Sequence, residues 1–212
     1  MNQPDDWAGH LFELRSEPVS ALADQADLVA SACHAMAVRF HQGGKLIAFG
    51  TGVSSTDAQH VAVEFVHPVI VGKRALPAIS LTTDIATVTG VAEQNLDEVF
   101  AHQIRYLAEP ADIALGISTG GISTGGTSTG GNSRPVLRGL EAASALGLLT
   151  VALAGGAADK LAASPAVEHL IVARSDDPRI VKELQVTAYH VLWELVHVFF
   201  EQPGVLEPGV VL

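Results

Sequence analysis

Cysteine, basic residues and long apolar runs are all scarce in this chain of 212 residues. The single cysteine, Cys33, excludes an internal disulfide and a metal site built from several thiolates, and it suits a reducing compartment. Only 12 Lys and Arg residues face 23 Asp and Glu residues, so the basic stripe of a nucleic-acid-binding protein is not expected. No uncharged apolar run reaches the roughly 18 residues of a membrane span, so no membrane partner is expected.

Aromatic residues are also few, at 5%, but apolar residues make up 48% of the chain. That share is enough to bury a full core, which excludes bulk disorder. Residues 1–6 are acidic and lack the basic region that begins a secretory signal. Together these features predict a cytoplasmic protein.

Short apolar segments alternate with helical patterns along most of the chain, which predicts an α/β fold with a parallel sheet covered on both faces. Residues 1–44 are expected to form an N-terminal helical segment, and residues 45–212 a single domain. The expected strands are residues 45–49, 77–81, 112–117, 148–154 and 169–173. The expected helices are residues 6–42, 54–66, 96–107, 135–146 and 178–200. In such folds ligands bind at the carboxyl ends of the strands.

One of these strand ends carries a repeat of low complexity. Residues 117–131 contain a unit of five residues three times over, ending in Ser-Thr-Gly-Gly. Such a repeat suits a flexible loop, because it cannot bury a core. It also suits an anion cradle, because glycine exposes backbone N–H groups, hydroxyls add donors and the next helix begins there.

The glycine turn at residues 50–55 has two of the three glycines of the dinucleotide fingerprint, with Ser55 in place of the third. The acidic residue that would bind a ribose is missing about 20 residues further on. A phosphorylated small molecule needs only the turn, its hydroxyls and a helix N-terminus, so that ligand is favoured over NAD.

Two helices carry candidate chemistry. His60 and Glu64 are four residues apart and share a helix face, where they can bind a divalent metal or move a proton. The same spacing also fits an ordinary surface pair. The last helix contains His190, which by spacing alone fits a packed residue as well as a catalyst.

Several of these segments together resemble the sugar isomerase (SIS) domain family, closest to its sedoheptulose 7-phosphate isomerase (phosphoheptose isomerase) subfamily. The segments that carry the resemblance are residues 50–60 with Glu64, residues 76–84, residues 112–119 continued at 131–133, and residues 179–190. The resemblance implies a single SIS domain with a flavodoxin-like, five-stranded parallel sheet flanked by helices. It also implies a homotetramer whose active sites lie between subunits, and a phosphorylated sugar as substrate.

The resemblance also implies roles for individual residues. Glu64 would be the base that removes a proton beside the carbonyl, and His190 its acid–base partner. Asp84 would meet sugar hydroxyls. Related enzymes hold zinc with His, Glu, Gln and His, and His60, Glu64 and His190 match three of these ligands. The substrate phosphate would be held at the two polar turns by Thr51, Ser54, Ser118, Thr119, Thr129 and Ser133.

Lys182 occupies the position of the Gln ligand, and a protonated lysine is a poor metal ligand. Lys182 therefore has two other expected roles, which are to bind the substrate phosphate or to pair with Glu183. The loop at residues 117–131 also carries about ten residues, two repeat units, beyond the family pattern. Such an insertion adds little closure entropy, because that cost grows only slowly with loop length.

The resulting prediction is an aldose–ketose isomerase that converts sedoheptulose 7-phosphate to D-glycero-D-manno-heptose 7-phosphate through an enediol. Two non-catalytic alternatives remain open from the sequence. One is a sugar phosphate sensor, and the other is a binding protein of the DnaA-initiator-associating type. Lys182 and the long loop favour the DnaA-initiator-associating type, whereas His60, Glu64 and His190 together favour the enzyme.

Overall fold

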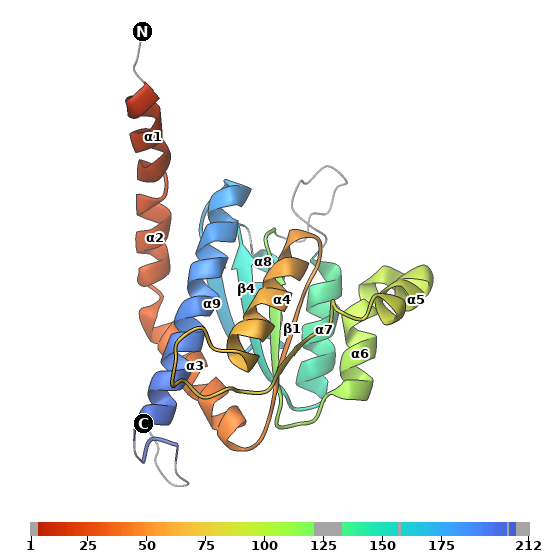
Figure 1. Ribbon diagram of the computed structural model, residues 1–212. Helices are drawn as coiled ribbons and strands as arrows, with labels where there is room; N and C mark the ends of the chain where they lie inside the picture. The colour runs from red at the N-terminus through yellow and green to blue at the C-terminus, as the bar shows by residue number, and fades with distance from the viewer. Residues whose placement is uncertain (1–3, 121–132, 157, 203, 207–212) are drawn as a thin grey trace.

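The computed structural model describes residues 4–120, 133–156, 158–202 and 204–206. Strands and helices alternate after three N-terminal helices (Figure 1). The strands are β1 (Leu46–Gly50), β2 (Ala78–Ser80), β3 (Ile113–Ser118), β4 (Leu149–Gly155) and β5 (His169–Ala173). The helices are α1 (Pro4–Glu13), α2 (Ser16–Ala23), α3 (Ala26–His41), α4 (Val53–Val66), α5 (Ile85–Asn95), the 3-10 helix η1 (Leu96–Glu98), α6 (Val99–Leu107), α7 (Arg134–Ala145), α8 (Asp159–Ala162) and α9 (Pro178–Glu201).

The five strands form one parallel sheet in the order β2-β1-β3-β4-β5. This is the flavodoxin-like order, and it confirms the predicted fold class. β1, β3 and β4 are buried along their whole length, as their continuous apolar sequences require. Strand order reverses between β1 and β3, so a crevice is expected at their carboxyl ends.

The two faces of the sheet carry separate apolar clusters. On one face α3, α4 and α9 pack through residues such as Phe65, Tyr189 and Trp193. On the other face α6 and α7 pack on the sheet, and the buried cluster there includes Phe49 of β1 and Leu140 of α7. The first of these faces positions the candidate site, because α4 and α9 lie side by side there and both begin near the carboxyl edge of the sheet (Figure 1).

The N-terminal segment is helical, as expected, but it is divided into three helices rather than one. α3 and α2 both pack against α9 and β5, whereas α1 projects beyond them (Figure 1). Large apolar side chains are exposed on α1 and α2, including Trp7 at 66% and Phe12 at 76%. Exposed aromatic groups of this size on a projecting helix are typical of a surface that meets another protein chain.

The predicted strands and long helices are confirmed within a few residues, but α5 and the short α8 were not predicted. α5 begins at Asp84, whose side chain accepts hydrogen bonds from the backbone N–H groups of Ala86 and Thr87. That is the usual N-cap arrangement, so Asp84 itself was the overlooked signal. Within the described ranges, no helix is long and apolar enough to cross a membrane.

Candidate active site

The turn between β1 and α4 is built on two glycines. Gly52 has a φ of +57°, a conformation that side chains rarely adopt. A Cβ on Gly50 would lie 2.8 Å from both Ser54 Cβ and Ile117 O, so glycine is needed there for close packing. These contacts bring the first turn of α4 against the ends of β1 and β3, where the topology predicts a ligand.

Ser54 lies in this first turn and is 1% exposed. Its Oγ has no hydrogen-bond partner among the described residues. A buried hydroxyl without a partner is costly, and natural proteins usually satisfy such groups. A hydroxyl left free at a helix N-terminus is therefore well placed to meet an anionic ligand.

His60, Glu64 and His190 converge, and one chain supplies all three. His60 Nε2 lies 3.1 Å from Glu64 Oε1, and the His60 and His190 rings are 5.3 Å apart between centroids. One donor atom from each residue lies within 4.8 Å of the other two. Glu64 is only 6% exposed, and its Oε2 has no partner in the described part of the chain. The spacing of the two helices therefore places a buried carboxylate with one free oxygen beside two imidazoles.

These three side chains also fit a divalent cation. Zinc bonds of about 2.1 Å in a tetrahedron place neighbouring ligand atoms roughly 3.4 Å apart. The distance of 3.1 Å between His60 Nε2 and Glu64 Oε1 is close to that value. The three ligand atoms all lie within 4.8 Å of one another, so rotation of the side chains is enough to bring them to the spacing of zinc ligands. Two histidines and a glutamate are also a known ligand set of catalytic zinc sites, with the fourth position open.

Tyr189 lies directly behind His60. Its hydroxyl is 2.7 Å from His60 Nδ1, and the residue is fully buried. Burial, followed by the nearby negative charges of Asp57 and Glu64, raises the pKa of the Tyr189 phenol. The phenol therefore keeps its proton at neutral pH and is available as a hydrogen-bond donor.

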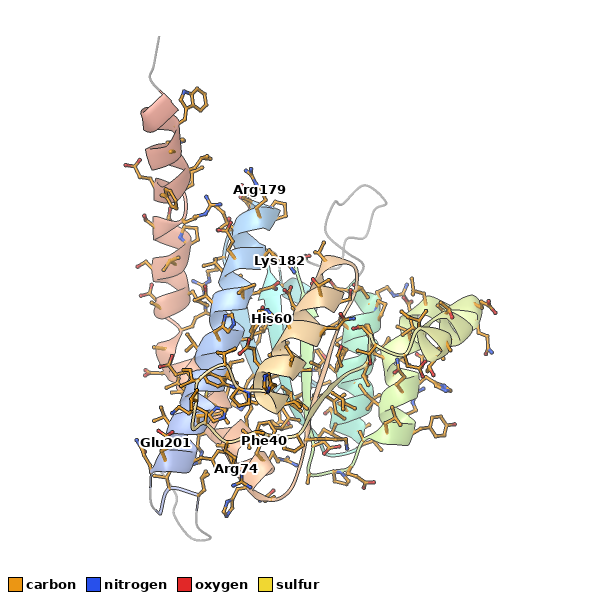
Figure 2. All side chains as sticks on the ribbon, viewed as in Figure 1. Phe40, His60, Arg74, Arg179, Lys182 and Glu201 are labelled. Atoms are coloured by element: carbon orange, nitrogen blue, oxygen red, sulfur yellow. The ribbon has the colours of Figure 1, made fainter. Side chains whose placement is uncertain are left out.

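Lys182 lies at the start of α9, beside the first turn of α4 (Figure 2). Its Nζ is 2.5 Å from Asp57 Oδ2, 2.9 Å from Val53 O and 3.4 Å from Thr56 Oγ1. The suggested pairing with Glu183 is wrong, because Glu183 instead accepts two hydrogen bonds from Arg15. Sequence spacing could not reveal the true partner, because Asp57 is buried on a different helix.

The end of β3 supplies further hydroxyls. Ser118 and Ser133 are buried, their Oγ atoms lie 2.5 Å apart, and both donate to Gly120 O. Thr119 is half-buried next to them. The structure therefore brings the two flanks of the predicted phosphate loop together, whereas Thr129 lies outside the described residues.

Gln185 was not singled out from the sequence, yet it is 1% exposed beside the end of β3. Its Nε2 donates to Ser118 O at 2.7 Å and to Leu153 O at 3.2 Å. α9 is thereby fixed to the ends of β3 and β4. Its amide in an apolar helix was the available signal, because a buried amide needs hydrogen-bond partners.

Among the described residues, the hydrogen bonds of Asp84 go to Ala86 and Thr87 and not to His60, Glu64 or His190. Asp84 is exposed, and bonds from Thr87 followed by the Ala86 N–H lower the pKa of its carboxyl. It lines a cavity of about 420 Å³ with His102 and Tyr106, to which none of the three clustered residues contributes. Thr51 is half-buried, and its carbonyl accepts from the Ser54 N–H.

Comparison with known proteins gives consistent matches. Residues 14–125 match the family model described as SIS domain. A protein named phosphoheptose isomerase from Solidesulfovibrio magneticus is 37% identical over 204 residues, which cover 95% of this chain and 93% of that protein. Another of the same name from Thermodesulfovibrio yellowstonii is 34% identical over 190 residues, covering 89% and 85%.

Solved structures agree on the fold. A phosphoheptose isomerase from Francisella tularensis matches with a TM-score of 0.79 and 26% identity, over 93% of this chain and 100% of that one. The match therefore covers nearly the whole chain.

Proposed function

Because the chain belongs to the SIS domain family, we propose that it interconverts sedoheptulose 7-phosphate and D-glycero-D-manno-heptose 7-phosphate. Relatives at 34–37% identity over most of the chain are named phosphoheptose isomerase. The observation that carries the proposal is the buried Glu64 carboxylate beside His60 and His190, with one oxygen that has no partner among the described residues. The relatives do not favour the sensor or the DnaA-associating alternative.

The reaction needs one base, one proton shuttle and a group that stabilises the oxyanion of an enediol. Glu64 Oε2 removes a proton from C1 of the ketose and returns it to C2. His190 moves the proton between the oxygens on C1 and C2. Because Glu64 and His190 come from two helices that pack together, their separation is set by the core rather than by loops.

The phosphate end of the sugar acts as a handle that orients the reacting end. Ser54 offers a buried hydroxyl at the α4 N-terminus, and Thr51 lies in the same turn. Ser118, Thr119 and Ser133 offer hydroxyls at the end of β3, and Thr129 belongs to the same loop in the sequence. Lys182 adds positive charge beside the first turn of α4. Asp84 meets sugar hydroxyls in this proposal, as the family resemblance implies.

Zinc is the proposed cofactor, held by His60, Glu64 and His190. When bound, the ion would polarise the substrate carbonyl as a Lewis acid. Lys182 does not serve as a fourth ligand, because its ammonium group is bonded to Asp57, Val53 and Thr56.

A cytoplasmic homotetramer is the proposed assembly. The exposed apolar side chains of α1 and α2, including Trp7, Leu11 and Phe12, support association through the N-terminal helices. Light scattering coupled to gel filtration tests this directly. The expected mass is four times that of the chain, and a monomeric mass would contradict the proposal.

Turnover is tested by incubating the purified full-length protein with sedoheptulose 7-phosphate and following the aldose product by NMR. Parallel samples contain added zinc or a chelator. We expect turnover in the zinc sample and a loss of about 10²- to 10⁴-fold in Glu64→Gln, the usual contribution of a general base. Tight substrate binding without turnover in every sample would instead support the sensor.

A further inference from the structure

Gln185 holds α9 against the carboxyl ends of two strands. Its side chain is buried, and its Nε2 lies 2.7 Å from Ser118 O of β3 and 3.2 Å from Leu153 O of β4. Carbonyl oxygens only accept hydrogen bonds, so both contacts require the NH₂ group of the amide at this position. The orientation of the Gln185 amide is therefore fixed by its surroundings.

Gln185 Oε1 has no hydrogen-bond partner among the described residues, although the atom is buried. An unpartnered buried acceptor lowers stability, and an apolar side chain would not carry this cost. A polar residue present at such a cost marks a place where function, and not packing alone, sets the residue. What the amide contributes in return is the pair of bonds to Ser118 O and Leu153 O.

A second close contact holds α9 at the same place. A Cβ on Gly155 would lie 2.2 Å from Val181 Cγ1 and 2.6 Å from Thr119 O, so only glycine fits there without moving α9 or the turn after β3. Val181 lies about one helical turn before Gln185. Two successive turns of α9 are thus held against the ends of β3 and β4.

These contacts lie between the two ends of the proposed site. Ser118 and Thr119 belong to the proposed phosphate site, and α9 also carries His190, the proposed proton shuttle. Gln185 precedes His190 by five residues, which is about 7.5 Å along the helix axis. The bonds of Gln185 therefore fix how far the phosphate end of a bound sugar lies from the reacting end.

We propose that Gln185 is a positioning residue that makes the site select ketose phosphates by the length of their carbon chain. The proposal rests on the proposed isomerase function for the places of the phosphate and of the reacting carbons. Gln185 acts through the backbone and not on the sugar, because its donors are used by Ser118 O and Leu153 O. It holds α9 at one distance from the end of β3, and a shorter sugar fits that distance less well.

The test compares sedoheptulose 7-phosphate with fructose 6-phosphate, which is one carbon shorter and has the same ketone at C2. Calorimetry gives both dissociation constants for the unmodified full-length protein and for Gln185→Met, whose side chain has similar length but no donor. We expect the unmodified protein to bind the longer sugar at least about tenfold more tightly. In Gln185→Met this ratio should fall by at least about fivefold, because the site is less preorganised. The dissociation constant of inorganic phosphate should stay within about twofold, because the hydroxyls of the turn are retained.

Gly155→Ala is a second variant, since the added Cβ pushes α9 and the turn after β3 apart, and the ratio should fall in the same direction. Gln25→Met is the matched control. This half-buried glutamine also donates to a strand carbonyl, that of Val172 in β5, an edge strand two places from β3. The control should leave the ratio unchanged. A ratio that is unchanged in Gln185→Met and Gly155→Ala, or that falls equally in Gln25→Met, would overturn the proposal, as would equal binding of both sugars by the unmodified protein.

Turnover distinguishes this proposal from the isomerase function on which it rests. If sedoheptulose 7-phosphate is converted, kcat of Gln185→Met should fall about 10²-fold, the cost of a displacement of about 1 Å. If that sugar binds but is not converted, the isomerase function alone is refuted, and the binding ratio still tests Gln185. Turnover with an unchanged ratio in Gln185→Met would refute the role of Gln185 alone, and absence of binding to either sugar would refute both.

Discussion

The Lys182 ammonium lies 2.5 Å from Oδ2 of Asp57, and this ion pair joins the N-terminal part of α9 to the N-terminal part of α4. Asp57 has 5% of its side chain exposed, and Lys182 has 30%. The buried carboxylate therefore depends on a partner that reaches it from the surface. Where a metal ligand is expected from the family, this chain has an interhelical ion pair instead.

Replacing Lys182 with Met should leave Asp57 buried without its partner. We expect the free energy of unfolding to fall by about 2 kcal/mol, the usual range for an unpaired buried polar or charged group with some solvent access. The double variant Asp57→Asn with Lys182→Met should recover at least half of this loss. Urea unfolding measures both, and a double variant no more stable than the single one would contradict the account.

The affinity of the protein for zinc should depend on His60, Glu64 and His190 and not on Lys182. His190→Ala removes a direct ligand, so affinity should fall by more than the roughly 10- to 100-fold that loss of an outer partner costs. Lys182→Met should leave affinity within about threefold. Equilibrium dialysis against a competing chelator gives both values, and an equal loss in the two variants would place Lys182 in the metal site.

Two adjacent serines, Ser54 and Ser55, allow a role in binding the substrate phosphate to be distinguished from a role in stabilising the turn. Ser54 Oγ is buried without a described partner, whereas Ser55 Oγ donates to Gly52 O. Ser54→Ala should raise KM for the sugar phosphate about tenfold, since a hydrogen bond to a charged group contributes about 1.5–3 kcal/mol. Its thermal stability should not fall. Ser55→Ala is the control, and equal KM values for the two variants would argue against the phosphate role.

Asp177 gives the stability of α9 a dependence on pH. Side-chain bonds from Arg179, followed by the Arg179 backbone N–H, lower the pKa of this N-cap carboxyl from 3.8 to about 2. Because the folded pKa lies below the unfolded one, the stabilisation is complete above about pH 4 and is lost as the pH falls toward 2. Asp177→Ser keeps an N-cap acceptor without the charge.

The melting temperature of Asp177→Ser should lie a few degrees below that of the unmodified protein at pH 7. The gap should narrow as the pH falls from about 4 to about 2. Thermal unfolding at pH 7, 4 and 3 measures it. A gap that stays constant over this range would show that the charge of Asp177 does not stabilise the helix.

The sheet was predictable because buried parallel strands are continuous apolar segments, such as β1 and β4, with glycine or polar residues at their ends. The α5 helix was missed because its start at Asp84 was interpreted only as a binding residue. Helix periodicity placed His60 and Glu64 on one face. Only the family resemblance brought His190 to them, because their meeting depends on how α4 packs against α9.

Other features of the site required tertiary structure. The partner of Lys182 is 125 positions away in the sequence, and no local pattern selects it over the adjacent Glu183. Tyr189 and Gln185 resemble ordinary residues of an amphipathic helix, because the groups that they bind lie on other elements. Long-range pairs of this kind follow from the packing of the whole chain.

The central claim is that Glu64 removes the substrate proton, and hydrogen exchange tests it most directly. The full-length protein is incubated with sedoheptulose 7-phosphate in D₂O, and deuterium on the sugar carbons is followed by NMR. We predict that the unmodified protein incorporates deuterium at C1 of the ketose and C2 of the aldose, and that Glu64→Gln binds the sugar phosphate without incorporating it. Exchange that persists in Glu64→Gln at an undiminished rate would contradict the account.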